Sequence, residues 1–112
     1  RAEEAARNKN YREQFDLCLS RAVANISTLS EYCLPFVKVG GAFISYKSSN
    51  IDEELDQGKK GIYLLGGKVS DVHKFSLPDS DLKRSFVVIQ KEKKTPKAYP
   101  RKAGMPSKDP LH

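Results

Sequence analysis

The stretch that decides the fold is VSDVHKFSLPDSDLKRSFVVIQ, residues 69–90. Residues 69–77 alternate between apolar and polar side chains, which predicts a strand. Residues 84–90 are rich in β-branched and aromatic side chains and predict a second strand. The link between them, residues 78–83, contains proline, aspartate and serine and is too short for a crossover connection. These two strands must therefore run antiparallel.

Two further strands are expected upstream, at residues 15–23 (FDLCLSRAV) and 42–47 (AFISYK). Between them, apolar side chains at helical spacing up to residue 37 predict a helix with one buried face. Ser27 or Thr28 can cap it, with Glu31 in the position that a capping box requires.

Glycine and proline mark helix ends and turns in the rest of residues 1–91. Pro35 should lie near the end of the first buried helix, and residues 39–41 read as a turn. Residues 51–65 predict a helix that stops at the following glycine pair. Residues 2–14 read as a polar helix, with an interruption near residues 8–10 as an alternative. The order is helix, strand, helix, strand, helix, strand, strand.

This order predicts an α/β domain over residues 1–91. Strand–helix–strand units form parallel pairs with right-handed crossovers, so we expect a mostly parallel sheet with a reversed last strand. Such a sheet is typical of the second half of a Rossmann-like methyltransferase fold, although other α/β folds also have a reversed edge strand. The strand at residues 15–23 should have one open edge, through which the isolated chain would self-associate, or which its N-terminal helix would refold to cover.

The charge of the chain is concentrated at one end. Residues 91–112 hold seven basic residues against two acidic ones, out of a net charge of +6 for the whole chain. Prolines at 96, 100, 106 and 110 predict an extended tail over residues 92–112 without helix or strand. A nearly neutral body with a basic tail implies an anionic partner, most simply nucleic acid.

Cys18 and Cys33 are the two cysteines, and their spacing gives no zinc-ligand pattern. We expect free, structural thiols in a reducing cytoplasm, with a disulfide as the minor alternative. The sequence predicts no metal site, and it contains no apolar run long enough to cross a membrane.

Four segments together resemble the glucose-inhibited division protein B family, also called ribosomal RNA small-subunit methyltransferase G. They are Arg1-Ala2-Glu3-Glu4, the run from Phe15 to Ala24, the run Arg84-Ser85-Phe86-Val87-Val88-Ile89, and the tail from Lys94 to Pro106. The resemblance implies methyl transfer from S-adenosylmethionine to guanine N7 of 16S ribosomal RNA, with the RNA or the small ribosomal subunit as partner, in the cytoplasm. The family's first half carries the glycine-rich turn that binds the cofactor, and that spacing is absent here. We therefore expect a C-terminal half, either an expressed fragment or a processed product, that is inactive alone.

The resemblance also implies site residues. Ala2 and Glu3 match the family's cofactor-contacting pair, although a helix start with acidic residues explains them equally from the sequence alone. Arg21, at a strand's carboxyl end, is expected to bind the cofactor or to line the active site, with a solvated charge as the alternative. From their positions at strand ends, Lys47 and Arg84 are expected on the same rim as catalytic residues, with a solvated charge as the alternative for Lys47.

Basic and aromatic side chains of the tail are the expected RNA contacts, with packing against the body as the alternative for the tyrosine. They are Lys94, Lys97, Tyr99, Arg101 and Lys102. Two other functions remain open from the sequence: a non-catalytic RNA- or ribosome-binding module, and an α/β interaction domain with a solubilising tail.

Overall fold

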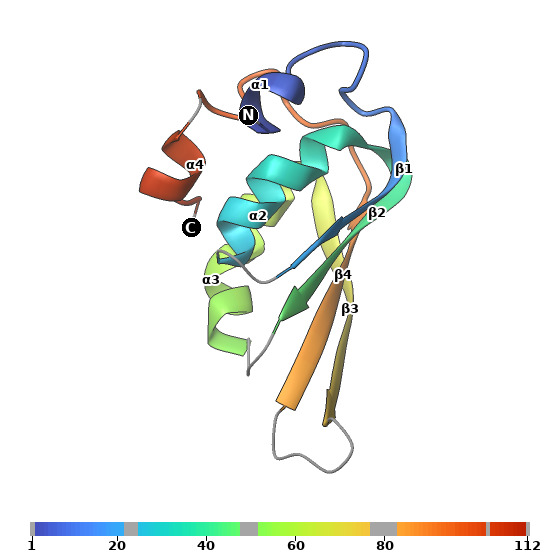
Figure 1. The fold of residues 1–112 in the computed structure, drawn as a ribbon, viewed down its shortest axis with the longest axis vertical. Helices are drawn as coiled ribbons and strands as arrows, with labels where there is room; N and C mark the ends of the chain where they lie inside the picture. The colour runs from blue at the N-terminus through green and yellow to red at the C-terminus, as the bar shows by residue number, and fades with distance from the viewer. Residues whose placement is uncertain (1, 22–24, 48–51, 77–82, 103, 112) are drawn as a thin grey trace.

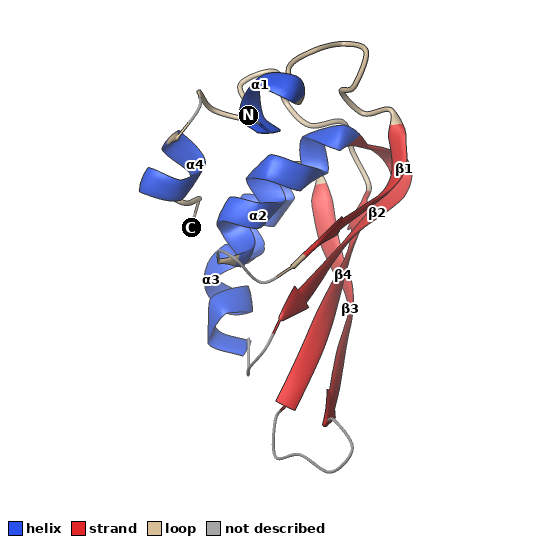
Figure 2. Ribbon diagram, in the orientation of Figure 1, coloured by secondary structure: helices blue, strands red, loops and turns tan. Residues whose placement is uncertain are grey.

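A computed structural model describes residues 2–21, 25–47, 52–76, 83–102 and 104–111. Figures 1 and 2 show helices packed against one face of a sheet, with further short helices near the chain ends. The elements are α1 (Ala2–Ala5), β1 (Phe15–Ser20), α2 (Ile26–Cys33), the 3-10 turn η1 (Leu34–Phe36), β2 (Val37–Lys47), α3 (Asp52–Leu64), β3 (Gly67–Ser76), β4 (Lys83–Lys91) and α4 (Met105–Lys108).

The sheet has the strand order β1-β2-β4-β3. β1 and β2 are parallel, whereas β4 is antiparallel to both β2 and β3. The α/β class and the antiparallel final pair are confirmed. The expectation of a mostly parallel sheet holds only in part, because β4 returns from β3 into the space between β2 and β3. The reversed strand is therefore interior, and only one pair of neighbours is parallel.

The core lies between the sheet and the two helices α2 and α3 (Figure 2). Its fully buried side chains come from all of these elements: Ile26, Leu34, Val37, Phe43, Ile62, Leu65, Val87 and Ile89. Gly58 allows α3 to approach α2 closely, because a Cβ there would lie 2.7 Å from Ile26 Cγ2. The glycine that weakens α3 as an isolated helix thus permits its packing.

α2 begins earlier than predicted. Its N-cap is Asn25, whose Oδ1 accepts a hydrogen bond from Thr28 N at 3.0 Å. The predicted caps, Ser27 and Thr28, are instead buried in the first turn of the helix. Pro35 lies in the 3-10 turn that ends the helical segment, as predicted.

β2 is longer than predicted, and Gly40 and Gly41 lie within it rather than in a turn. The pairing of β1 with β2 shifts between Phe15 and Leu17, which makes this region a bulge. Gly40 has φ +93°, and a Cβ on Gly41 would lie 2.5 Å from Asp16 O. Glycine at both positions therefore serves the bulge. The predicted polar helix over residues 2–14 is also wrong beyond Ala5, where turns follow.

The tail is not an extended arm, so this expectation is wrong. It crosses from the end of β4 past α1 to α4, which lies beside α2 (Figure 1). Thr95 is buried and its Oγ1 donates to Leu65 O at 2.6 Å, while Thr28 Oγ1 donates to the carbonyl of the buried Pro106 at 3.0 Å. The prolines of the tail are compatible with this packing, because these contacts use side chains and carbonyl oxygens and do not need the backbone N–H that proline lacks. The domain boundary at residue 91/92 stays a prediction. No helix in the described part of the chain is long and apolar enough to span a membrane.

Candidate functional site

The register of the sheet brings the predicted cations Arg21, Lys47 and Arg84 to one rim. Arg21 follows the last residue of β1, and Lys47 is the last residue of β2. Lys47 pairs with Ser85 of β4, so the backbone of Arg84 lies one position further along the same rim. The side chain of Arg84 is outside the described part of the structure.

Arg21 is exposed, and it forms no ion pair with any described residue. A free guanidinium at the carboxyl ends of parallel strands suits an anionic or hydrogen-bond-accepting ligand, because open α/β sheets bind ligands at this edge.

Lys47 has different surroundings from those expected. Alternation along β2 turns its side chain to the helical face, where it is 6% exposed. Its Nζ lies 2.8 Å from Glu54 Oε2, which also accepts a hydrogen bond from Ile26 N at 2.8 Å. This ion pair ties β2 and α3 to the start of α2, so Lys47 is held by the protein rather than presented to solvent.

Ala2 and Glu3 begin α1, and their side chains are outside the described part of the structure. Ala5, at the other end of α1, lines a hollow together with Phe15, the first residue of β1. α1 therefore lies by the amino end of β1 (Figure 1), and the structure does not bring it together with Arg21 at the opposite end.

The five predicted RNA contacts of the tail divide into two groups. Lys94, Lys97 and Lys102 are exposed. Tyr99 packs against the hydrophobic core, which is the alternative left open from the sequence. Arg101 is only 22% exposed at its side chain and is paired with Glu31.

Glu31 is a buried carboxylate that sequence reasoning assigned to a helix cap. Its side chain is 0% exposed and accepts from Arg101 N at 2.7 Å, from Nε at 3.1 Å and from Nη2 at 2.9 Å. These hydrogen bonds raise the pKa of Arg101. Glu31 lies opposite the apolar positions of the predicted helix, so the sequence pattern contains no signal for this contact. The pair fastens the tail to α2.

A second buried ion pair, Lys91 with Glu13, was not expected. Lys91 Nζ lies 3.1 Å from Glu13 Oε2 and donates to the carbonyls of Leu34 and Val37 at 2.7 and 2.8 Å. Burial lowers the pKa of Lys91, and the hydrogen bond with Glu13 partly opposes this effect. The pair joins the end of β4 to the segment before β1.

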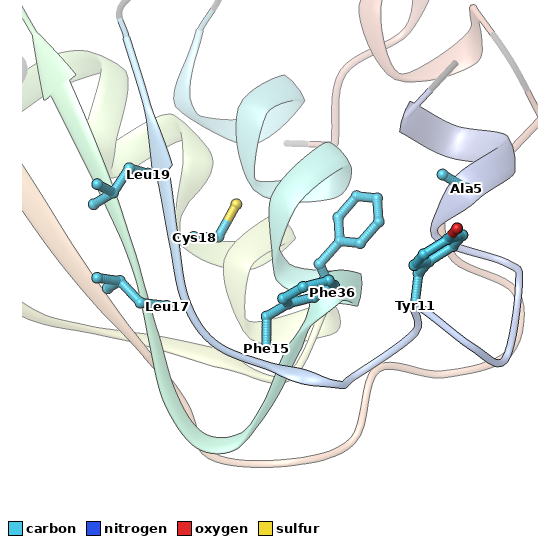
Figure 3. A pocket seen from close by; sticks show the side chains of 7 residues that line it. All are labelled: Ala5, Tyr11, Phe15, Leu17, Cys18, Leu19 and Phe36. Atoms are coloured by element: carbon cyan, nitrogen blue, oxygen red, sulfur yellow. The ribbon is translucent and has the colours of Figure 1, made fainter.

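The outer edge of β1 is an apolar surface, shown in Figure 3. Phe15, Leu17 and Leu19 are 45%, 50% and 57% exposed, and they line a hollow of about 390 Å³ together with Ala5, Tyr11, Cys18 and Phe36. β1 is the edge strand of the described sheet, as predicted. An exposed edge with apolar side chains is a surface for association.

Cys18 and Cys33 are free thiols, both partly buried. A hydrogen bond between them lowers the pKa of Cys18 and raises that of Cys33, to which burial also contributes. Among the described residues, no group of three or more His, Cys, Asp or Glu side chains could hold a metal ion.

The fold is similar to that of a solved structure. The crystal structure of an M1.HpyAVI–SAM complex superposes with a TM-score of 0.61 over 83% of this chain and 51% of that chain. The sequence identity is 13%, so this likeness concerns the fold alone.

Comparisons of sequence are more informative than this likeness in fold. Ribosomal RNA small subunit methyltransferase G of Clostridium tetani is 56% identical over 111 residues, and that of Oceanobacillus iheyensis is 52% identical. Both alignments cover 99% of this chain but 46% and 47% of the relatives, so the chain spans about half their length. Residues 1–86 match the family described as rRNA small subunit methyltransferase G, or GidB. The chain therefore belongs to the rRNA small subunit methyltransferase G family.

Proposed function

We propose that this chain forms the carboxyl-terminal half of an enzyme that transfers a methyl group from S-adenosylmethionine to N7 of a guanine in 16S ribosomal RNA. The observation that carries the proposal is the family match of residues 1–86, together with relatives more than 50% identical over nearly the whole chain. The four-stranded arrangement, which resembles that in a complex with S-adenosylmethionine, supports it.

The proposed reaction needs little acid–base chemistry. Bound S-adenosylmethionine would supply an electrophilic methyl group. Guanine N7 carries a lone pair outside the aromatic system, so it can attack without first losing a proton and needs no general base. The protein's contribution is to hold N7 in line with the methyl group, with the reacting atoms ~3–3.5 Å apart.

Arg21 and Arg84 are the residues that we propose for positioning the guanine and the cofactor at the rim. A cation there should donate to guanine O6, because a donor on N7 itself would block the nucleophile. Arg21 fits this role or that of holding an anionic group, since it is exposed and unpaired among the described residues. Lys47 would act through Glu54 by fixing the end of β2.

Ala2 and Glu3 remain the proposed cofactor contacts, carried by the family resemblance. Tyr99 packs against the hydrophobic core and Arg101 is paired with Glu31, so we no longer propose them as RNA contacts. The proposed RNA contacts of the tail are the exposed Lys94, Lys97 and Lys102. The partner would be 16S ribosomal RNA or the small ribosomal subunit in the cytoplasm.

The proposal can be tested by joining this chain to the first half of the Clostridium tetani relative. Arg21→Gln in this chimera should lower kcat/KM for methyl transfer by about a hundredfold, the effect of removing a donor aimed at the reacting group. Lys60→Gln is the matched control, since Lys60 is an exposed cation on α3. RNA binding without any methyl transfer by the parent chimera would instead favour a non-catalytic RNA-binding module.

A further inference from the structure

A second cationic site lies away from the rim. A hollow of about 270 Å³ is lined by Arg7, Arg12 and Lys97, all of them cations. The two arginines come from the segment between α1 and β1, and the lysine comes from the tail. This segment and the tail meet at the amino ends of β1 and β2 in Figure 1, opposite the end at which Arg21 follows β1.

The guanidinium groups are oriented by carbonyl oxygens. Arg7 donates to the carbonyls of Lys97 and Ala98 at 3.5 and 3.3 Å, and also to that of Pro100. Arg12 Nη2 donates to the carbonyls of Thr95 and Pro96 at 3.1 and 3.0 Å. Two arginines from one segment thus hold the tail in place, and the tail brings Lys97 to the same hollow.

Carbonyl oxygens orient a cation but carry no net charge that could neutralise it. Elsewhere, buried and partly buried cations are paired with carboxylates: Lys47 with Glu54, Lys91 with Glu13, and Arg101 with Glu31. By contrast, Arg7, Arg12 and Lys97 form no ion pair with any described residue, and none of the described acidic side chains lines the hollow. The positive charge of this site is therefore available to bind an external anion.

We propose that Arg7, Arg12 and Lys97 form a binding cleft for a phosphodiester of the RNA backbone. Planar guanidinium groups and an ammonium group suit a phosphate, because the fork of an arginine matches two phosphate oxygens while lysine adds a point charge. This inference rests on the proposed RNA substrate. The cleft would hold a part of the RNA distant from the methylated base, so it would contribute affinity and orientation without sequence preference.

Lys97→Gln is the variant that tests the cleft, because the Lys97 side chain forms no hydrogen bond or ion pair with any described residue and only its backbone carbonyl accepts from Arg7. Lys60→Gln is the control of equal charge on α3. Anisotropy of a fluorescein-labelled RNA hairpin is measured with the 112-residue chain at salt concentrations from about 50 to 200 mM. A parallel titration adds inorganic phosphate at constant ionic strength.

Lys97→Gln should lower the slope of log affinity against log salt by about 0.7 to 0.9, the value of one phosphate contact, while Lys60→Gln leaves the slope unchanged. Equal slopes for the two variants would overturn the cleft without bearing on methyl transfer by the chimera. Inorganic phosphate should displace the RNA less readily from Lys97→Gln than from the parent, because phosphate and the RNA backbone would share this site; equal displacement from both would also overturn the cleft. If the slope falls but the chimera transfers no methyl group, the proposed function fails and the cleft stands.

Discussion

Removing the side chain of Arg101 should destabilise the chain, because Glu31 would then be left as a buried carboxylate without its cation. Breaking a buried ion pair from one side costs about 3–5 kcal/mol. The backbone N–H of Arg101 would still donate to Glu31, at 2.7 Å in the structure, so we expect Arg101→Ala to lie near the lower end, at about 3 kcal/mol. For a chain of this size that corresponds to a fall in Tm of about 12 °C.

Matched variants separate this effect from loss of surface charge. Arg101→Lys keeps the charge but loses the two-pronged contact, so it should cost about 1–2 kcal/mol. Lys102→Ala removes an exposed neighbouring cation and should change stability by less than about 0.5 kcal/mol. Glu31→Gln should destabilise the parent but stabilise Arg101→Ala, because it removes the unpaired buried charge.

Thermal melts followed by circular dichroism measure the four single variants and the double variant that combines Glu31→Gln with Arg101→Ala. If Arg101→Ala melts within about 2 °C of the parent, like Lys102→Ala, the pair does not fasten the tail. If Glu31→Gln destabilises Arg101→Ala further, an unpaired buried carboxylate is not the cause of the loss.

Three further predictions follow from the ion pairs, the open edge and the family. Lys91→Met leaves Glu13 without its cation and should lower the free energy of unfolding, measured by urea denaturation, by about 3–5 kcal/mol. Lys94→Met, at an exposed position, should not lower it. Equal effects of the two substitutions would contradict a stabilising role of the buried ion pair. Light scattering should show that the chain self-associates, and Leu19→Lys on β1 should reduce this association. A parent chain that stays monomeric would show that the β1 edge does not mediate association. S-adenosylmethionine should bind the isolated chain weakly or not at all in calorimetry, and micromolar affinity would contradict this expectation.

The strands were predictable because each is a short apolar or alternating run, and the tight link before residue 84 requires an antiparallel pair. The position of β4 between β2 and β3 could not be predicted. The local sequence pattern of a hairpin does not specify which other strand its second strand pairs with. Helix caps were misplaced by two or three residues, since Asn25, Ser27 and Thr28 are all suitable cap residues.

The predicted rim was correct in backbone placement but not in the surroundings of every side chain. Lys47 shares the alternation of Phe43 and Ser45, so its burial followed from the same parity that marks the buried face of β2. The partner of Arg101 could not be found in this way, because Glu31 lies seventy positions away in the chain. Composition alone made the tail look like a free arm, although specific contacts with α2 and with Arg7 hold it.

The central claim is that this chain completes a guanine-N7 methyltransferase of 16S ribosomal RNA. Its most direct test is to incubate the chimera with labelled S-adenosylmethionine and small-subunit RNA, naked or in the assembled subunit, and to identify the methylated nucleoside by mass spectrometry. The account predicts 7-methylguanosine, formed by the chimera and not by the 112-residue chain alone. Methylation of another base or another guanine atom, or no transfer to either form of the RNA by a folded chimera, would contradict it.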